Sequence, residues 1–479
     1  MSQPSEAHEP FPTLRIFADR LEPRGAYAVS QARYLQPDAG AVSRLEALLA
    51  ARDAGVVAHF YMDPELQGVL AACRWPHIHV SDSLVMADRA VDMARAGART
   101  IAVLGVDFMS ENVRAMLDAA GFTDVPVYRV AAEPIGCSLA EAADALAYGA
   151  YLQQAAATPR ALHVVYINTS LLAKARAAAI VPTITCTSSN VVRTVLQAFA
   201  QVPQAHVFFG PDTYMGRNLR TLMQGAVELG DDACRALHPA HDAASVRSAL
   251  QRFHHFEQGA CVVHHLFGEA VVRRVREEHP DALYSAHLEV PGEMFALAAE
   301  AARSGRGVVG STSNILDFVR AEVRRRAAAG ERGVLEVVLG TEAGMITPIV
   351  REVQALLAES ASGLAVDVIF PVAADAVAAT DDAELGVVPG VLGGEGCSTA
   401  GGCATCPYMK MNTLAGLLHV LEHADDGTDL AAFHPRATRE PVAGRSAAEL
   451  GSEPILAMRA FGRGGTLPES LVTRIVAAS

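Results

Sequence analysis

The stretch that decides the fold is GVVAHFY (55–61), which is followed by HIHVSDS (77–83) and then by TIAVLGV (100–106). Between the last two runs lies LVMADRAVDMARAG (84–97), whose Ala-rich composition favours a helix. Short β-rich runs that alternate with helical stretches are typical of parallel sheets with helices on both faces. We therefore predict an α/β fold.

The same order of features occurs three times along the chain. A strand that ends in polar residues comes first, then a strand that runs into a Ser-rich turn, and then a strand that ends in Gly and a polar pair. The Ser-rich turns are VSDSL (80–84), TCTSSN (185–190) and VGSTSN (309–314). They recur about every 105–130 residues, which is too long for the unit of a solenoid. The repeat predicts three Rossmann-like α/β/α domains, related by a pseudo-threefold axis, around one shared site.

The expected domain boundaries follow from this repeat and from changes in composition. We expect an N-terminal arm at 1–40, three α/β repeats at 41–130, 131–255 and 256–371, a linker with a cysteine segment and helix at 372–435, and a C-terminal tail at 436–479. The tail is expected to be partly ordered, and no chemistry is assigned to it.

Composition excludes several classes of protein. The chain has 479 residues, a formal net charge of −14 and 51% hydrophobic residues. The acidic balance argues against a main role in binding nucleic acid or an anionic membrane. The first residues, MSQPSEAHEP, lack the order of a secretory signal, and no apolar run reaches about 18 residues. We therefore expect a cytoplasmic protein, in which disulfide frameworks are uncommon.

The Ser-rich turns predict anion binding. A Ser or Thr at the start of a helix accepts hydrogen bonds from the first amides, and the remaining amides and the helix dipole favour an anion. Open α/β sheets also bind ligands at the carboxyl ends of their strands. The hydroxyls expected to line these pockets are those of Ser83, Ser188, Ser311 and Thr312.

A second group of polar side chains falls at or near the ends of predicted strands. Its members are His59, Tyr61, Tyr166, Asn168, His264, His287 and Glu289. Several hydrogen-bond donors and one carboxylate suit a small substrate with several negative charges. Glu289 is then available for proton transfer.

One cysteine follows each repeat, and these three are Cys137, Cys261 and Cys406. Their equivalent positions predict three thiolates near the pseudo-threefold axis, and thiolates select zinc or an iron–sulfur cluster. Zinc would want a fourth ligand, which Cys403 could provide. A 4Fe–4S cluster on three cysteines instead leaves one iron open to substrate. The spacing alone does not choose between these two.

The ordered motifs of the chain are AHFYMDPELQ, SDSL, LGVDFMSENV, GCSLAEA, YINTS, CTSSN, GPDTYMG, CVVH, HLE, GSTSN, GTEAGM and CPYMKMN. Over residues 50–420 this series resembles the quinolinate synthase (quinolinate synthetase A) family, and the ending GGCATCPYMKMN resembles its longer branch. There are departures. The family's HPE is HLE at 287–289, its GDS is SDS at 81–83, and an acidic residue is missing after Glu65.

The resemblance implies an iron–sulfur transferase of de novo NAD biosynthesis. It would condense iminoaspartate with dihydroxyacetone phosphate to give quinolinate, with loss of phosphate and water. A 4Fe–4S cluster would be held by Cys137, Cys261 and Cys406, and its open iron would act as a Lewis acid. Cys397 and Cys403 then have no ligand role.

The resemblance also implies roles for the other site residues and for partners. The catalytic residues would be Glu289, Tyr166 and His264. The substrate-binding residues would be His59, Tyr61, Ser83, Asn168, Ser188, His287, Ser311 and Thr312. L-Aspartate oxidase or aspartate dehydrogenase would supply iminoaspartate, and neither nucleic acid nor membrane is expected as a partner. Two alternatives stay open: an Fe–S hydro-lyase acting on another small polyanion, and a non-catalytic metal-binding regulatory protein.

Overall fold

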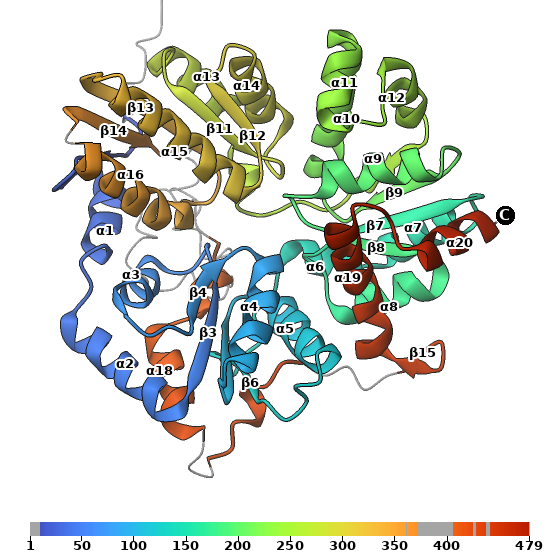
Figure 1. The fold of residues 1–479 in the computed structure, drawn as a ribbon, viewed down its shortest axis with the longest axis horizontal. Helices are drawn as coiled ribbons and strands as arrows, with labels where there is room; N and C mark the ends of the chain where they lie inside the picture. Colours follow the sequence, from blue (N-terminus) through green and yellow to red (C-terminus); the bar gives the residue numbers. More distant parts are fainter. Residues whose placement is uncertain (1–9, 361, 372–405, 425–427, 437–440, 479) are drawn as a thin grey trace, which may run out of the picture.

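The computed structural model describes residues 10–360, 362–371, 406–424, 428–436 and 441–478. In this part of the chain, three large sheets are surrounded by helices (Figure 1). No helix among the described residues is long and apolar enough to cross a membrane. The predicted α/β fold is confirmed.

The first sheet contains the stretch with which the sequence repeat begins. Its strands are β3 (Ala54–His59), β4 (Ile78–Ser81), β5 (Thr100–Leu104) and β6 (Val127–Arg129). They lie in the order β4-β3-β5-β6, and every neighbouring pair is parallel. Strands β3 and β5 are buried along their whole length, as the continuous apolar runs of a parallel sheet require.

The second sheet has the same strand order and the same parallel pairing. Its strands are β7 (Ala161–Tyr166), β8 (Thr183–Cys186), β9 (His206–Gly210) and β10 (Phe253–His255). They lie in the order β8-β7-β9-β10. In both sheets, therefore, the second strand in sequence lies beside the first, and the third strand lies on the first strand's other side.

The third sheet repeats this order and adds two strands from the N-terminus. The strands β11 (Leu283–His287), β12 (Gly307–Gly310), β13 (Gly333–Gly340) and β14 (Leu364–Ile369) lie in the order β12-β11-β13-β14. Strand β1 (Thr13–Ile16) then pairs antiparallel with β14, and β2 (Leu21–Arg24) pairs antiparallel with β1. Part of the expected N-terminal arm is thus the edge of the third sheet, with Leu14 and Ile16 fully buried.

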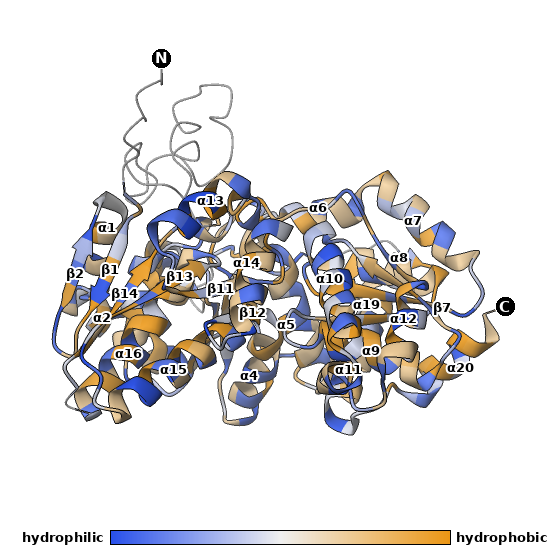
Figure 2. Cartoon of the chain, turned by 90° about the horizontal axis from the view of Figure 1, so that it is seen from above, coloured by the Kyte–Doolittle hydropathy of each residue, from blue (hydrophilic) through white to orange (hydrophobic). Residues whose placement is uncertain are grey.

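The helices fall into three groups along the chain, one for each sheet. The first group is α1 (Ala26–Tyr34), α2 (Ala39–Arg52), α3 (Pro64–Ala72), α4 (Ser83–Arg95) and α5 (Asp107–Ala119). The second group is α6 (Ser138–Asp144), α7 (Leu146–Ala156), α8 (Leu171–Ile180), α9 (Val191–Gln201), α10 (Thr213–Leu229), α11 (Asp231–Leu237) and α12 (Ala243–Leu250). The third group is α13 (Glu269–Glu278), α14 (Gly292–Ala302), α15 (Thr312–Ala328) and α16 (Ile346–Ser360). Figure 2 shows hydrophobic strands between helices that carry both hydrophobic and hydrophilic residues.

The three Ser-rich turns do not all cap their helices with serine. The N-cap of α4 is Asp82, whose carboxylate accepts hydrogen bonds from the amides of Leu84 and Val85. The N-cap of α9 is Asn190, which makes no side-chain capping bond. Ser311 does cap α15 and accepts a hydrogen bond from the Asn314 amide. The hydroxyls of Ser83 and Ser188 therefore have no part in capping.

The segment that follows Cys406 packs against the first sheet's helices. It forms η3 (Met409–Met411), α18 (Leu414–His423) and η4 (Ala431–Phe433). The Arg52 guanidinium, at the end of α2, donates to the carbonyls of Leu421 and Glu422 at 3.1 and 2.9 Å. Figure 1 accordingly shows α18 beside α2.

Residues 441–478 belong to the predicted C-terminal tail and are folded. They form a short β-ribbon, β15 (Pro441–Val442) and β16 (Arg445–Ser446), and the helices α19 (Ala447–Gly464) and α20 (Glu469–Ala477). Ile455, Met458 and Phe461 of α19 are buried, and the helix packs on α8. Gly451 permits this close approach, because a Cβ there would lie 2.2 Å from the Leu171 carbonyl oxygen.

Candidate active site

One cavity is lined by residues from all three sheets. His59 ends β3, Tyr166 ends β7 and His287 ends β11, which are the first strands of the three repeats. All the predicted site residues except Ser311 line this cavity, namely His59, Tyr61, Ser83, Cys137, Tyr166, Asn168, Ser188, Cys261, His264, His287, Glu289, Thr312 and Cys406. The Ser311 hydroxyl instead lies 2.8 Å from the Asn314 side-chain oxygen in the capping box of α15.

The Glu289 carboxylate has contacts from two repeats. The Tyr166 hydroxyl donates to its Oε1 at 2.5 Å, and His264 Nδ1 lies 3.2 Å from its Oε2. His287 Nδ1 lies 3.7 Å from Oε1, and the rings of His264 and His287 are stacked with centroids 4.8 Å apart. Burial alone would raise the pKa of Glu289, but His264, His287 and Tyr166 together lower it to about 2. Glu289 is therefore an ionised carboxylate at neutral pH.

The histidines at the strand ends are neutral. Burial lowers the pKa of His59 to about 4 and that of His287 to about 3, although the charge of Glu289 opposes both shifts. Each neutral imidazole offers one donor and one acceptor. The cavity thus holds one buried negative charge among groups that can hydrogen-bond without being charged.

Thr341 is a functional candidate that sequence reasoning missed. Its hydroxyl lies 3.3 Å from the Tyr61 hydroxyl and 3.3 Å from His264 Nε2, so it joins side chains of the first and third repeats. Thr341 directly follows β13, within the third-repeat motif GTEAGM. The sequence feature that could have revealed Thr341 was its position at the end of a strand. The same feature identified Tyr166 and His287.

Glu342 was also missed. It lines the cavity, and its two carboxylate oxygens accept from the Cys406 amide at 3.1 Å and from the Gly344 amide at 2.7 Å. Burial raises the pKa of Glu342 to about 8, although these amides oppose the shift. Its contact with Cys406 crosses 64 residues of sequence, so no local pattern could have revealed it.

The three predicted cysteines meet at the cavity. Burial raises the pKa of Cys137 to about 11 and that of Cys406 to about 12, and it raises the pKa of Cys261 well above its ordinary value. Cys137 and Cys406 also contribute to the shift of Cys261, which requires the three sulfurs to be close. Each sulfur accepts from the amide three residues further on, in Ala140, His264 and Met409 respectively. These amides favour thiolates, but the buried charges would still need a cation.

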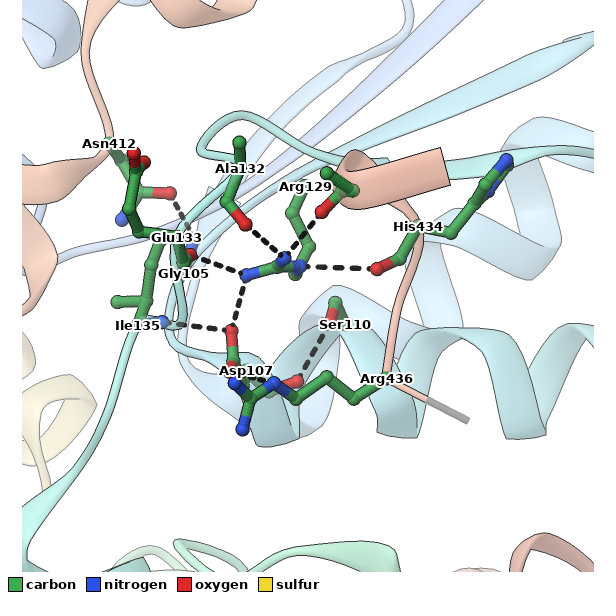
Figure 3. Close-up of polar contacts among 11 residues, drawn as sticks. Gly105, Asp107, Ser110, Arg129, Ala132, Glu133, Ile135, Asn412, His434 and Arg436 are labelled. Carbon is green, nitrogen blue, oxygen red and sulfur yellow. Dashed lines mark hydrogen bonds and ion pairs between the residues drawn. The ribbon is translucent and has the colours of Figure 1, made fainter. Parts of the chain in front are cut away.

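A buried arginine ties the segment that leads to Cys137 and the segment that follows α18 to the first sheet (Figure 3). Arg129, at the end of β6, bonds Asp107 Oδ1 at 2.7 Å and the Glu133 carbonyl at 3.0 Å. It also donates to the carbonyls of Ala432 and His434 at 2.7 and 3.2 Å. The segment that leads to Cys137 and the segment that follows α18 therefore share one anchor.

One mixed group of donors in the cavity has the spacing of a metal site. A sulfur of Cys261, a ring nitrogen of His264 and a carboxylate oxygen of Glu289 all lie within 4.8 Å of one another. Cys403, the fourth zinc ligand considered from the sequence, and Cys397 lie outside the described residues.

Comparison with known proteins gives a consistent family. Residues 43–365 match the family described as "NadA: Quinolinate synthetase A protein". The chain is 52% identical over 483 residues to "Quinolinate synthase, chloroplastic" of Nicotiana tabacum, which covers 98% of this chain and 66% of that protein. The protein of the same name from Arabidopsis thaliana is 52% identical over 483 residues, with 98% and 67% covered. That from Oryza sativa subsp. japonica is 48% identical over 494 residues, with 98% and 70% covered. The chain thus spans about two thirds of the length of these relatives.

The prediction of a cytoplasmic protein was wrong. These curated relatives are all named as chloroplastic, which points to a plastid. The physical reason for the error is that both compartments are aqueous. An acidic, non-membrane composition is equally compatible with either, so charge and hydropathy could not distinguish them.

Proposed function

We propose that this chain, which belongs to the quinolinate synthetase A family, condenses iminoaspartate with dihydroxyacetone phosphate to give quinolinate. It is an enzyme of de novo NAD biosynthesis, and the reaction releases phosphate and water. The observation that carries the proposal is the cavity in which three thiols, neutral histidines and one ionised carboxylate from three sheets face one another. By the names of its relatives, the enzyme works in a plastid.

We infer that the three sheets, with the helices around them, are pseudo-threefold-related domains with the boundaries 41–130, 131–255 and 256–371. The shared strand order supports this inference, since each sheet has its first strand between its second and third. Residues 406–424 and 428–436 then complete the site, and residues 441–478 pack on the second domain through α19 and α8.

The cofactor proposed is a 4Fe–4S cluster on Cys137, Cys261 and Cys406. The donor set fits such a cluster, because three buried sulfurs with amide donors need compensating positive charge. When bound, a cluster with three cysteine ligands supplies an open iron that acts as a Lewis acid towards a substrate oxygen or nitrogen.

Glu289 is proposed as the acid/base residue. Its carboxylate is ionised, so Oε2 can accept a proton from the substrate while Oε1 keeps its hydrogen bond to Tyr166. Tyr166 orients this carboxylate and can return a proton through the same contact. His264, held through Thr341, orients Oε2. The site is buried, which limits hydrolysis of the imine substrate by bulk water.

The remaining polar residues are proposed to bind the carboxylates and phosphate of the substrates. His59, His287 and Tyr61 can donate from neutral side chains, and they avoid the cost of a buried unpaired cation. The other proposed contacts are Ser83, Asn168, Ser188 and Thr312. Ser311 acts through α15, whose first residue is Thr312. L-Aspartate oxidase or aspartate dehydrogenase is the proposed source of iminoaspartate.

The test is anaerobic purification followed by measurement of iron, the visible spectrum and quinolinate formation. We expect about four iron atoms per chain, a brown protein and activity with both substrates. Cys261→Ala should lose the iron and the activity. The control is Cys234→Ala, since Cys234 is buried in α11 outside the cavity, and it should keep both. A wild-type chain that takes up no iron and forms no quinolinate would refute the proposed function.

A further inference from the structure

The donor group of Cys261, His264 and Glu289 is distinct from the three-cysteine set, although it shares Cys261. Cys261 and His264 stand three residues apart at η1 (His264–Leu266), and Glu289 follows β11. His264 is fully buried and Glu289 is 4% exposed. One sulfur, one imidazole nitrogen and one carboxylate oxygen therefore converge on one point from two elements.

The orientation of His264 is already that of a metal ligand. Its Nε2 lies 3.3 Å from the Thr341 hydroxyl, which can accept a hydrogen bond from Nε2 and so allow the lone pair to stand on Nδ1. Histidines that bind metals commonly donate their other N–H in this way. Nδ1 makes no hydrogen bond with any described residue, although Glu289 Oε2 is 3.2 Å away. In the tautomer that carries its proton on Nε2, His264 Nδ1 and Glu289 Oε2 are both acceptors, and a cation between them would satisfy both. In the metal-free protein a proton on Nδ1 can join the same two atoms.

Glu289 has one oxygen available for such a cation. Its Oε1 accepts from Tyr166 at 2.5 Å, which fixes the carboxylate and leaves Oε2 directed at His264. Two zinc ligands at ordinary bond lengths and a tetrahedral angle lie about 3.3–3.8 Å apart. The donors here are within 4.8 Å of one another, so small side-chain movements bring them to that spacing.

We propose that a single divalent cation of the Zn²⁺ type binds Cys261, His264 and Glu289 in the protein that lacks its cluster. Mixed sulfur, nitrogen and oxygen donors select Zn²⁺ or Fe²⁺ over Mg²⁺ and Ca²⁺. The bound ion excludes the cluster, because both need Cys261, and it occupies the carboxylate that would take up the substrate proton. The cation therefore holds the enzyme in an inactive, cluster-free state. The exclusion rests on the proposed function, whereas the cation site itself does not.

The test starts from full-length protein freed of metal under anaerobic conditions. Equilibrium dialysis against Zn²⁺ should give one ion per chain. Glu289→Gln, which is nearly isosteric, and His264→Ala should each weaken Zn²⁺ binding at least about 10-fold. Cys406→Ser should bind Zn²⁺ like the wild type, because Cys406 is not among the proposed ligands, yet it should no longer assemble the cluster. His264→Ala should lose most of its Zn²⁺ binding but still assemble the cluster and retain its iron.

Co²⁺ provides a spectroscopic check on the same site. A cation at Cys261, His264 and Glu289 has one cobalt–thiolate bond, so its charge-transfer absorption should be about one third of that for three such bonds. Two results would place the ion among the cysteines and overturn the inference. One is a charge-transfer absorption as strong as that of three cobalt–thiolate bonds. The other is a loss of Zn²⁺ binding in Cys406→Ser that equals the loss in Glu289→Gln. If the wild type takes up Zn²⁺ as expected but never iron, the proposed function fails and the cation site stands.

Discussion

The Tyr166 hydroxyl and the Glu289 carboxylate bring the first strands of the second and third repeats to a single contact of 2.5 Å. Both groups are buried, and the ionised carboxylate strengthens the hydrogen bond. The Tyr166 hydroxyl therefore orients Oε1 of the proposed acid/base residue, while His264 faces Oε2. Tyr166→Phe removes that hydroxyl and leaves the aromatic ring in place.

Tyr166→Phe should lower kcat/KM for quinolinate formation by about 10–150-fold. A hydrogen bond to a charged group contributes roughly 1.5–3 kcal/mol, and each 1.4 kcal/mol is about tenfold. Steady-state kinetics of the iron-loaded variant measure this effect. The matched control is Tyr148→Phe, which removes a buried hydroxyl that lies 2.8 Å from His163 and outside the cavity. Equal kinetic losses in both variants would contradict the role of Tyr166.

At the scale of elements, helix α8 supports the loop that carries Tyr166 and Asn168. Lys174 is fully buried in α8, and its ammonium donates to the carbonyls of Ile167, at 3.0 Å, and Thr169. Glu111 of α5 accepts from the first amide of α8, that of Leu171, at 2.8 Å. A buried lysine with carbonyl partners makes the stability of this junction depend on pH.

Stability should rise with pH between about 7 and 10.5 because of Lys174. Burial lowers the pKa of Lys174 from 10.5 to about 7, so in this window the unfolded chain holds a proton that the folded chain has released. The stability contribution is lowest below pH 7 and increases by up to ~1.4 kcal/mol per pH unit above it. Urea unfolding of the wild type and of Lys174→Met at pH 7.5–9.5 tests this. The difference between their free energies of unfolding at each pH cancels the contributions of the other titratable groups. Parallel pH slopes for the two proteins would rule the assignment out.

Arg129 is a second buried cationic side chain that holds backbone in place, here at the first sheet. Its side chain is 4% exposed, and it holds Asp107 together with backbone from the adjacent segment at Glu133 and from the distant segment at His434 (Figure 3). Arg436 reaches the other oxygen of Asp107 at 3.2 Å. The contact with His434 crosses 305 residues, so no local sequence pattern reveals it.

Arg129→Met should destabilise the fold by about 3–5 kcal/mol, because it removes the buried one of the two guanidinium partners of Asp107 and leaves several carbonyls without their donor. Chemical denaturation measures this loss. Arg217→Met is the matched control, since Arg217 pairs with Glu257 at an exposed position and should cost at most about 1 kcal/mol. Similar denaturation midpoints for the two variants would show that Arg129 is not an anchor.

At the scale of the whole molecule, the succession of strands and helices and most residues of the cavity could be predicted from the sequence. Buried parallel strands are continuous apolar runs, and polar residues at their carboxyl ends meet at one edge, so His59, Tyr166 and His287 were identifiable. The rest depended on tertiary contacts. Strand β1 pairs Thr13 with Ile369, and Glu342 receives the Cys406 amide, neither of which has a local signature.

The helices of the C-terminal tail were not identified from the sequence, because their packing partner is distant in the chain. Gly451 and Pro454 lie inside α19, where Gly451 allows the helix to approach α8. Gly451→Ala should therefore lower the thermal midpoint, with a loss of about 1–3 kcal/mol, because its Cβ would meet the Leu171 carbonyl. Gly464→Ala, at the end of the same helix, has no described atom within 4 Å of the added Cβ and should be neutral or slightly stabilising. Calorimetry on both variants decides the matter, and equal midpoints would contradict close packing of α19 on α8.

The wide separation of the cavity's cysteines in sequence has a consequence for synthesis on the ribosome. Cys137 is made 269 residues before Cys406. At about 5–20 residues per second, the growing chain carries an incomplete set of thiols for roughly 13–54 seconds. During this time Cys137, and later Cys261, is open to oxidants and stray metal ions without Cys406 beside it. The full set of three thiols exists only after residue 406 has been made.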